Sequence, residues 1–495
     1  MRSPRNLLED PCWQGHDLGH PLPDATHAVS VALPRWSDVI AYEENEPSCR
    51  AALRAVYPRF GLHPLVRELA DLALKESGLA PSTGYSCWPY PTEAAAEAAG
   101  NHCQRQALDG FSAIRTVRGL PCLVADPIRT MAAKAFWQHT GLGASSRLAA
   151  IALGKEASPD TAIAKSALST VIQRLAGIYG CAEDAISLHP SGMAALHSAL
   201  QRIAVLHPGR PVLQIGFPYV DVLKLPQVVF SGAELLLDDS PAQVRAALDR
   251  LQPGAIVVEL PSNPLLRCVN LPEIAALAHQ RGIPVIADDT IGSALNIDAL
   301  PHADLVFSSL TKSFAGRGDV MAGSLVISPL SRWSETWSQS PGSAQGVAGL
   351  ADADAIALEQ GSRDVRERVS VLNAHTLSLA RRLQQHPAIA QVFHPGTCER
   401  FNRLRRADGG HGCLLSFALK EGADKAARVY DALQVCKGPS LGTAFTLACP
   451  YVLLAHYGEL PWAETCGVPS HLLRVSVGLE DPNQLWSRFE RALSA

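Results

Sequence analysis

Between residues 165 and 330, short apolar runs alternate with stretches of helical periodicity, and this alternation constrains the fold more than any other feature of the chain. The helical stretches at 193–207 and 271–282 repeat apolar residues every three or four positions. The apolar runs lie at residues 210–219, 254–264, 283–290 and 303–312. Strands separated by helices imply a parallel sheet with crossover connections. We therefore predict an α/β fold whose larger domain contains a mainly parallel sheet.

The segments on either side of this region have different patterns. Residues 1–60 are rich in Pro, Trp and short polar turns, which predicts an irregular arm, and residues 61–160 are Ala-rich with a mainly helical pattern. A polar stretch at 328–346 marks a boundary, and a long helical pattern follows at 357–387.

Strands are predicted near the C-terminus at 412–419 and 471–481, so this end reads as α+β. We expect three parts: an arm with a helical extension (1–160), a large domain (161–335) and a small α+β domain (336–495).

Bulk properties exclude several classes of function. The formal net charge of −4 gives no sign of nucleic-acid or membrane-surface binding. No apolar run reaches the roughly 18 residues of a membrane span, and the N-terminus lacks the apolar core of a signal peptide. The twelve cysteines form no CxxC pair, so no metal site is predicted. We expect a cytoplasmic protein whose partners are small molecules rather than nucleic acid or membrane.

Polar side chains collect where the predicted strands end. In an open α/β sheet, ligands bind beyond the carboxyl ends of the strands. The side chains at these ends are Glu259, Ser262, Asn263, Asp288, Asp289, Ser309, Thr311 and Lys312. A lysine at the end of a buried strand is costly unless it is paired, solvated or covalently engaged. Parallel strands would place it in one crevice with carboxylates, an amide and hydroxyls.

Three further segments complete a possible ligand site. Ser191 is a plausible N-cap, and the backbone of Gly192 at the following helix start suits a phosphate. Tyr219 offers a stacking face, and Arg474 a fork for a carboxylate.

Pyridoxal phosphate (PLP) would use all of these parts: a lysine for its aldehyde, a carboxylate for its pyridine nitrogen, a helix start for its phosphate and a face for its ring. Each residue alone has a structural reading, as a surface lysine, a cap, a turn former or an ion pair.

Several of these segments resemble one enzyme family. "ELPSNPLLR" (259–267), "IADDT" (286–290) and "SSLTKSFAGRGDVMAGSLV" (308–326) look like the Cys/Met-metabolism family of PLP enzymes. "SGMAAL" (191–196) and "RVSVGLED" (474–481) resemble its phosphate-binding and carboxylate-binding segments. Segments from residue 18 onward resemble the extended N-terminus of fungal-type cystathionine γ-synthases, and the likeness covers nearly the whole chain. It implies a fold-type I, aspartate aminotransferase-like architecture.

The resemblance also implies roles for single residues. Lys312 would form the Schiff base, Asp288 rather than Asp289 would face the pyridine nitrogen, and Asn263 the ring hydroxyl. The phosphate would be bound through Ser191, Gly192, Met193, Ser309 and Thr311, and the ring would stack on Tyr219. Tyr57 and Arg59 match a pair that reaches the phosphate of a neighbouring subunit, which implies a homodimer as the minimal active unit and a homotetramer as the expected assembly. Ser440 and Arg474 would hold the substrate carboxylate.

Two positions depart from the family pattern. Phe445 stands where many members have a glutamate associated with the distal end of the substrate. Arg317 adds a positive charge near the lysine, which would either favour an anionic acyl group or pair with Asp319; we favour the pair.

The resemblance predicts γ-replacement on an O-acyl-L-homoserine with cysteine, giving cystathionine in transsulfuration and methionine biosynthesis. Lys312 would move protons, with Tyr57 and Tyr219 as candidates for activating the amine or the thiol. Alternatives are a cystathionine or methionine lyase, a γ-substitution enzyme of secondary metabolism with another nucleophile, and a non-catalytic regulator. The intact Lys312, Asp288 and Arg474 argue against the regulator.

Overall fold

A seven-stranded sheet forms the centre of the larger domain in the computed structural model, which describes residues 4–58, 60–79, 84–339 and 347–494. The strand order is β4-β10-β9-β8-β7-β5-β6, and every neighbouring pair is parallel except those made by β10. The strands are β4 (Ile186–His189), β5 (Val212–Ile215), β6 (Ala233–Leu236), β7 (Ala255–Glu259), β8 (Val285–Asp288), β9 (Leu305–Ser309) and β10 (Gly323–Ile327). The predicted α/β class with a mainly parallel sheet is confirmed.

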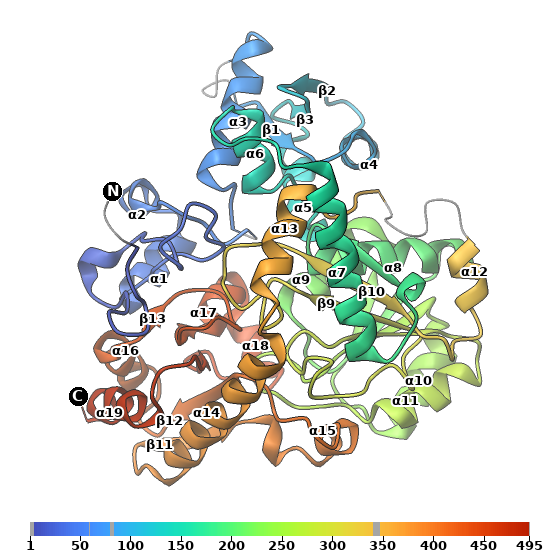
Figure 1. Cartoon of the computed structure of the whole chain (residues 1–495). Helices are drawn as coiled ribbons and strands as arrows, with labels where there is room; N and C mark the ends of the chain where they lie inside the picture. The colour runs from blue at the N-terminus through green and yellow to red at the C-terminus, as the bar shows by residue number, and fades with distance from the viewer. Residues whose placement is uncertain (1–3, 59, 80–83, 340–346, 495) are drawn as a thin grey trace.

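Helices cover both faces of this sheet (Figure 1). One face packs against α8 (Gly192–Leu206) and α9 (Val220–Val229). The other packs against α7 (Thr161–Tyr179), α10 (Pro241–Leu251), α11 (Leu271–His279), α13 (Asp352–Gly361) and the start of α14 (Val365–Gln385). Successive residues of β7 alternate between these two cores, which is why the central strands read as continuous apolar runs.

The C-terminal part is the expected smaller α+β unit. Its sheet has the order β11-β12-β15-β14-β13, antiparallel except between β13 and β14. The strands are β11 (Ile389–Phe393), β12 (Leu414–Leu419), β13 (Cys436–Lys437), β14 (Leu447–Pro450) and β15 (Leu473–Ser476). Its helices are the body of α14, α15 (Glu399–Leu404), α16 (Gly422–Ala432), α17 (Tyr451–Ala455), α18 (Leu460–Thr465) and α19 (Pro482–Leu493).

The helical pattern at 357–387 proves to be two helices, α13 and α14, separated at 362–364. The break lies where the loop after Lys312 docks. A Cβ on Gly361 would stand 2.9 Å from the Ala315 carbonyl oxygen, and Arg368 of α14 donates to the carbonyl oxygens of Ser313 and Phe314. The chain therefore interrupts its helix to support the lysine loop.

Residues 4–58 form an arm along the C-terminal part, with the short helices α1 (Trp36–Glu43) and α2 (Pro47–Ala52). Backbone hydrogen bonds attach it to its own chain, from Val29 N–H to the Gly318 carbonyl (2.9 Å) and from Leu33 N–H to the Lys437 carbonyl (2.9 Å). The buried Lys437 ammonium donates to the Pro34 carbonyl at 2.8 Å. The arm is thus part of the fold of its own chain.

Residues 61–79 and 84–152, here called the accessory region, stand above the large sheet in Figure 1. The helices are α3 (Pro64–Glu76), α4 (Glu93–Gln106), α5 (Thr130–Thr140) and α6 (Ser146–Ala152). Between them lies an antiparallel sheet that the helical expectation for this region missed: β1 (Ser86–Pro89), β3 (Leu120–Ala125) and β2 (Ser112–Val117) in that order. A short buried strand such as β3 cannot be told from a helix by periodicity.

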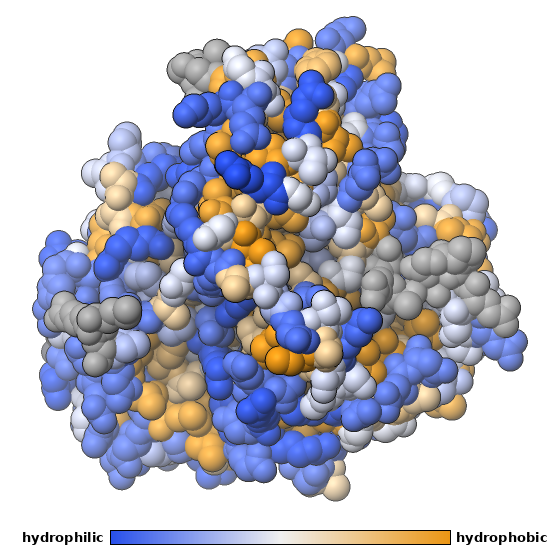
Figure 2. Space-filling model, turned by 45° about the horizontal axis from the view of Figure 1, so that its top comes forward, coloured by the Kyte–Doolittle hydropathy of each residue, from blue (hydrophilic) through white to orange (hydrophobic). Residues whose placement is uncertain are grey.

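Several apolar side chains of the accessory region are exposed, and Figure 2 shows apolar groups interspersed with hydrophilic ones on this part. The most exposed are Leu108, Phe111, Ile128 and Met131. No helix in the described part of the chain combines the length and apolar character of a membrane span.

Candidate active site

One pocket opens where the strand ends of the large sheet meet the C-terminal part, the arm and the accessory region. It is lined by twelve of the thirteen residues singled out from the sequence. These are Tyr57, Ser191, Gly192, Met193, Tyr219, Asn263, Asp288, Ser309, Thr311, Lys312, Ser440 and Arg474. Arg59 lies outside the described residues. Residues up to 417 positions apart in the sequence, Tyr57 and Arg474, thus share one cavity, as the strand-end rule predicts for most of the set.

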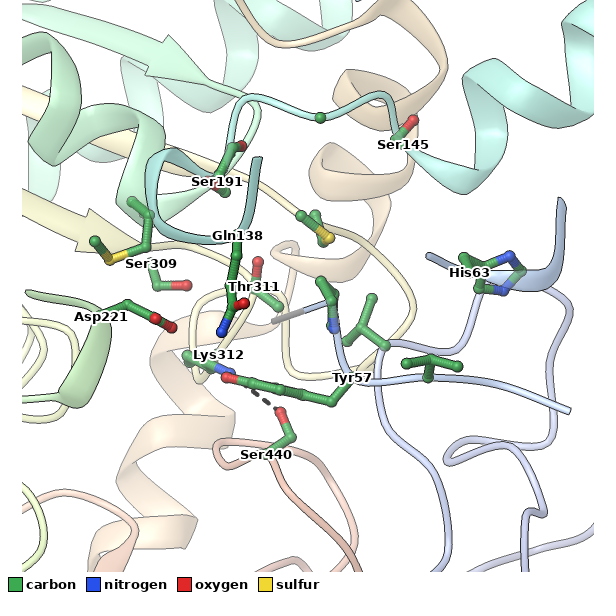
Figure 3. Close-up of a pocket in the computed structure, with 18 of the residues that line it drawn as sticks. Tyr57, His63, Gln138, Ser145, Ser191, Asp221, Ser309, Thr311, Lys312 and Ser440 are labelled. Atoms are coloured by element: carbon green, nitrogen blue, oxygen red, sulfur yellow. Dashed lines mark hydrogen bonds between the residues drawn. The ribbon is translucent and has the colours of Figure 1, made fainter. Parts of the chain in front are cut away.

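Lys312 lies at the centre of this pocket, three residues beyond β9 (Figure 3). Its Nζ is 3.0 Å from the Tyr57 hydroxyl and 3.2 Å from the Ser440 hydroxyl. Only 8% of the residue is exposed. A buried amine with two hydroxyl acceptors is positioned for chemistry rather than for solvation.

Tyr57 contacts Lys312 of its own chain. The arm that carries it is held by backbone bonds to the same chain, and the Lys312 ammonium lies 4.8 Å from the centre of its ring. Burial alone would raise the pKa of the Tyr57 hydroxyl, but the charge and hydrogen bond of Lys312 lower it below its ordinary value. Tyr57 is therefore prepared to give up its proton more readily than a free tyrosine.

The start of α8 forms an anion-binding corner. The Ser191 hydroxyl caps the helix by accepting the N–H of Ala194 at 3.0 Å. The first N–H groups of a helix have no partner within it, and the dipole favours negative charge there. A Cβ on Gly192 would stand 2.8 Å from the Cβ of Ser309, so only glycine lets the two segments approach this closely. The Thr311 hydroxyl faces the same pocket but also bonds the backbone of Ala322.

Two adjacent aspartates at the end of β8 have different surroundings. Asp288 lines the pocket and accepts the N–H of Thr290 at 2.9 Å, and burial raises its pKa to about 6. Asp289 points away and accepts the Tyr179 hydroxyl at 2.9 Å, and burial raises its pKa to about 7. An anionic Asp288 in this dry position favours a cationic partner such as a protonated ring nitrogen.

Arg474 of β15 marks the opposite side of the pocket. Its guanidinium donates to the Ser440 carbonyl at 2.9 Å and to the Asn263 side-chain oxygen at 3.4 Å, and it stacks over Tyr451. These contacts hold the Arg474 guanidinium in place while the residue still faces the cavity. This geometry is suited to binding a carboxylate through two parallel hydrogen bonds.

Glu259, a residue to which no role was assigned from the sequence, organises two of the others. Its buried carboxylate accepts the N–H of Tyr219 at 2.9 Å and of Asn263 at 3.0 Å. Burial, together with the nearby Asp288, raises the pKa of Glu259 well above its ordinary value. The strand-end pattern that pointed to Asn263 was the available signal for this carboxylate too.

Neither departure from the family pattern lies in the pocket lining. Phe445 is buried in a core cluster with Leu22 and Leu447. Arg317 is exposed and donates to the Gln360 carbonyl. The expected pair with Asp319 is wrong, because Asp319 contacts Arg147, whose guanidinium donates to its backbone carbonyl at 2.6 Å.

The residues present fit PLP. The glycine-lined helix start accommodates a phosphate, and the buried Asp288 favours a cation. Tyr219 and Lys312 line the same pocket as both. No group of three or more His, Cys, Asp or Glu arranged for a metal ion occurs among the described residues.

The chain is similar to several known proteins over most of its length. A family described as "Cys/Met metabolism PLP-dependent enzyme" matches residues 163–494. A cystathionine gamma-synthase of Neurospora crassa is 31% identical over 96% of this chain and 98% of its own. An L-2-amino-4-chloropent-4-enoate dechlorinase/desaturase of Streptantibioticus cattleyicolor is 32% identical over 95% of this chain and 97% of its own. A crystal structure of cystathionine gamma synthase from Xanthomonas oryzae pv. oryzae superposes with a TM-score of 0.59 at 24% identity, covering 69% of this chain and 89% of that one.

Proposed function

Because the chain belongs to the Cys/Met metabolism PLP-dependent enzymes, we propose that it catalyses γ-replacement on an O-acyl-L-homoserine with cysteine, forming cystathionine. The observation that carries this proposal is the position of Lys312, whose amine lies between the Tyr57 and Ser440 hydroxyls in a pocket that Arg474 closes on one side. The full-length similarity to a cystathionine gamma-synthase supports the same reaction.

Each side of the pocket would hold one part of the cofactor. The N–H groups of Gly192 and Met193, with the hydroxyls of Ser309 and Thr311, would bind the phosphate. Asp288 would pair with the ring nitrogen, Asn263 with the ring hydroxyl, and Tyr219 would cover a ring face. When bound, PLP would supply an electrophilic carbon for the substrate amine and an electron sink for charge developing on the substrate carbons.

The side chains of this chain would do the remaining work. Arg474 binds the substrate carboxylate and so fixes the α-carbon near Lys312. Tyr57, with its lowered pKa, accepts a proton from the incoming substrate ammonium. The Lys312 amine then removes the α-proton.

Loss of a β-proton follows, so that the acyloxy group leaves from the γ-carbon. Cysteine, deprotonated with the help of Tyr57 or Tyr219, forms a carbon–sulfur bond at the same carbon, and the protons return to the α- and β-carbons.

The proposal extends to the cellular role and the assembly of the enzyme. A role in methionine biosynthesis in the cytoplasm, and assembly as a homodimer or homotetramer, are proposed from the family resemblance.

A product assay tests the reaction. Purified enzyme receives O-acetyl- or O-succinyl-L-homoserine, each with cysteine, with sulfide, or with no nucleophile. Cystathionine formed only with cysteine supports the proposal. Formation of 2-oxobutyrate and ammonia alone, even with cysteine present, would identify a lyase instead.

A second candidate is a specialised γ-substitution or elimination enzyme of secondary metabolism. The dechlorinase/desaturase relative, similar over 95% of this chain, favours it. Turnover of a γ-halogenated or γ,δ-unsaturated amino acid together with inactivity on both homoserine esters would select this reading.

A further inference from the structure

The last turn of α5, residues Trp137–Gly141, carries the accessory region into the active site. Trp137, Gln138 and Gly141 line the pocket. The Gly141 carbonyl accepts the Ser191 hydroxyl at 2.9 Å, and His139 Nδ1 lies 2.9 Å from the Asp221 carboxylate. Ser191 caps the phosphate-binding helix and Asp221 belongs to the first turn of the helix that follows Tyr219. This turn therefore touches two of the elements that would hold the cofactor.

Packing fixes the turn in this place. Gly141 ends α5 in the left-handed conformation with φ of +62°, and a Cβ there would stand 2.9 Å from the Cβ of Met193. The Thr140 hydroxyl donates to the Phe136 carbonyl, and the Trp137 ring packs against Trp88 with centroids 5.1 Å apart. A side chain on this turn consequently has a defined direction.

Gln138 is the member of the turn whose side chain extends into the cavity. In Figure 3 it runs from the side of Ser191 in the direction of Lys312, and it lines the same pocket as Lys312 and Tyr57. Ser440 lies on the other side of the lysine in the same view, where its carbonyl also holds Arg474. An amino acid whose carboxylate is bound by Arg474 and whose α-carbon faces Lys312 would extend its side chain toward Gln138.

We propose that Gln138 is a specificity-determining residue that hydrogen-bonds an uncharged acceptor on the γ-carbon of the substrate, such as the carbonyl oxygen of an ester. This inference rests on the proposed function of the pocket. A side-chain amide offers two donors and an acceptor without charge, so it matches a carbonyl better than a carboxylate.

The charges on this side of the pocket point the same way. The guanidinium of Arg147 is already bound to the Asp319 carbonyl and to the Asp354 carboxylate. Burial lowers the pKa of His63 to about 4, so this imidazole is neutral near pH 7. Among the described residues on this wall, Gln138 is thus an uncharged donor positioned to meet the substituent, and an anionic group would find no cation that is not already paired.

Two unreactive ligands separate this role from others. N4-acetyl-L-2,4-diaminobutyrate carries a carbonyl on a γ-substituent that does not leave, and L-norleucine fills similar space without a polar atom. Holoenzyme is titrated with each while the absorbance of the bound cofactor is followed, which gives dissociation constants without turnover. We compare the wild type with Gln138→Leu, Gln138→Glu and the control Gln104→Leu, which changes an exposed glutamine of α4.

The expected result is a loss of about tenfold in the preference for the acetyl ligand over norleucine in Gln138→Leu, the size of one well-placed hydrogen bond. Gln138→Glu should lose at least as much, because its carboxylate repels the carbonyl, while Gln104→Leu keeps the wild-type preference. An unchanged preference in both Gln138 variants overturns the proposal. So does equal weakening of both ligands with release of cofactor, which would make Gln138 a cofactor or structural residue. Failure of the γ-replacement itself would appear in the product assay and not in these ratios.

Discussion

The two halves of the pocket differ in kind. The strand-end half carries the ionisable groups of Lys312, Asp288, Glu259 and Arg474, which are all buried and hydrogen-bonded within this half or to Tyr57. The half built from the arm and the accessory region presents mainly neutral groups, such as Val29, Leu62, His63, Trp137 and Gln138. The strand-end half can transfer protons and stabilise charge, and the other half can select the substrate by its shape and polarity.

This difference indicates how the strand-end half can keep the same reactive groups while the other half changes which substrates are accepted. The reactive half is built on strands whose ends the sheet forces together. The neutral half is docked from a separate small sheet and can vary without moving the lysine. Changes in the first half should therefore alter the rate or, at Arg474, the binding of the substrate carboxylate. Changes in the second half should alter the choice of substrate or, at Tyr57, the transfer of one proton.

The largest expected effect is that of Lys312→Ala. Because the amine transfers protons and anchors the cofactor, kcat should fall by about 10⁴-fold or more. Steady-state kinetics check this, with Lys224→Ala, which changes a half-exposed lysine of α9, as the control. A Lys312→Ala enzyme with near wild-type turnover would contradict the assignment of the reactive half.

Tyr57→Phe should come next, with a fall in kcat of about 10²-fold, because one proton acceptor is lost. Since Tyr57 contacts Lys312 of the same chain, mixing this variant with Lys312→Ala should restore nothing. Differently tagged chains are co-expressed and the mixed assembly is assayed. If Tyr57 served a neighbouring subunit, each mixed dimer would regain one complete site. Recovered activity would therefore contradict the assignment of Tyr57 to the active site of its own chain.

Arg474→Ala should weaken binding of amino-acid substrates by about 10- to 100-fold, the cost of a lost charge-assisted contact, with a smaller change in kcat. Dissociation constants from cofactor absorbance provide the test. Arg403→Ala on α15, at the surface, is the matched control. Unchanged affinity would remove Arg474 from the substrate site.

The smallest effect concerns Asp289 behind the reactive half. Burial raises its pKa from 3.8 to about 7, so the folded protein keeps a proton that the unfolded chain loses near pH 4. The stability that this proton provides is present at low pH and is lost as pH rises through 7. Asp289→Asn stays neutral and still accepts from Tyr179, so its Tm should rise relative to wild type by on the order of a few degrees between pH 4 and 7. A difference in Tm that does not change with pH would show that the carboxyl is not buried in this way.

The contrast between the two halves of the pocket also explains which parts of the fold and the site could be predicted from the sequence. Gly192, Asn263, Asp288 and Lys312 belong to strand ends or helix starts whose order along the chain fixes their meeting, so the α/β class and this half of the pocket could be predicted. The choice of Asp288 over its neighbour also followed from the motif.

Gln138 and Asp221 carried no such signal, since their places depend on how α5 docks against α8 and α9. The accessory sheet escaped prediction because its strands are short and two of them lie among Ala-rich helices. Tyr57 could be named, but which chain it would serve depended on the arm's packing, and this is held by bonds such as that from the Tyr430 hydroxyl to the Leu33 carbonyl.

The most direct test of the central claim is to find the lysine to which the cofactor is bound. Holoenzyme is reduced with borohydride, digested and examined by mass spectrometry. The account predicts that the reduced cofactor is attached to the peptide containing Lys312 and that Lys312→Ala retains none. Attachment at another lysine, or at none in an enzyme that is active with PLP, would contradict it.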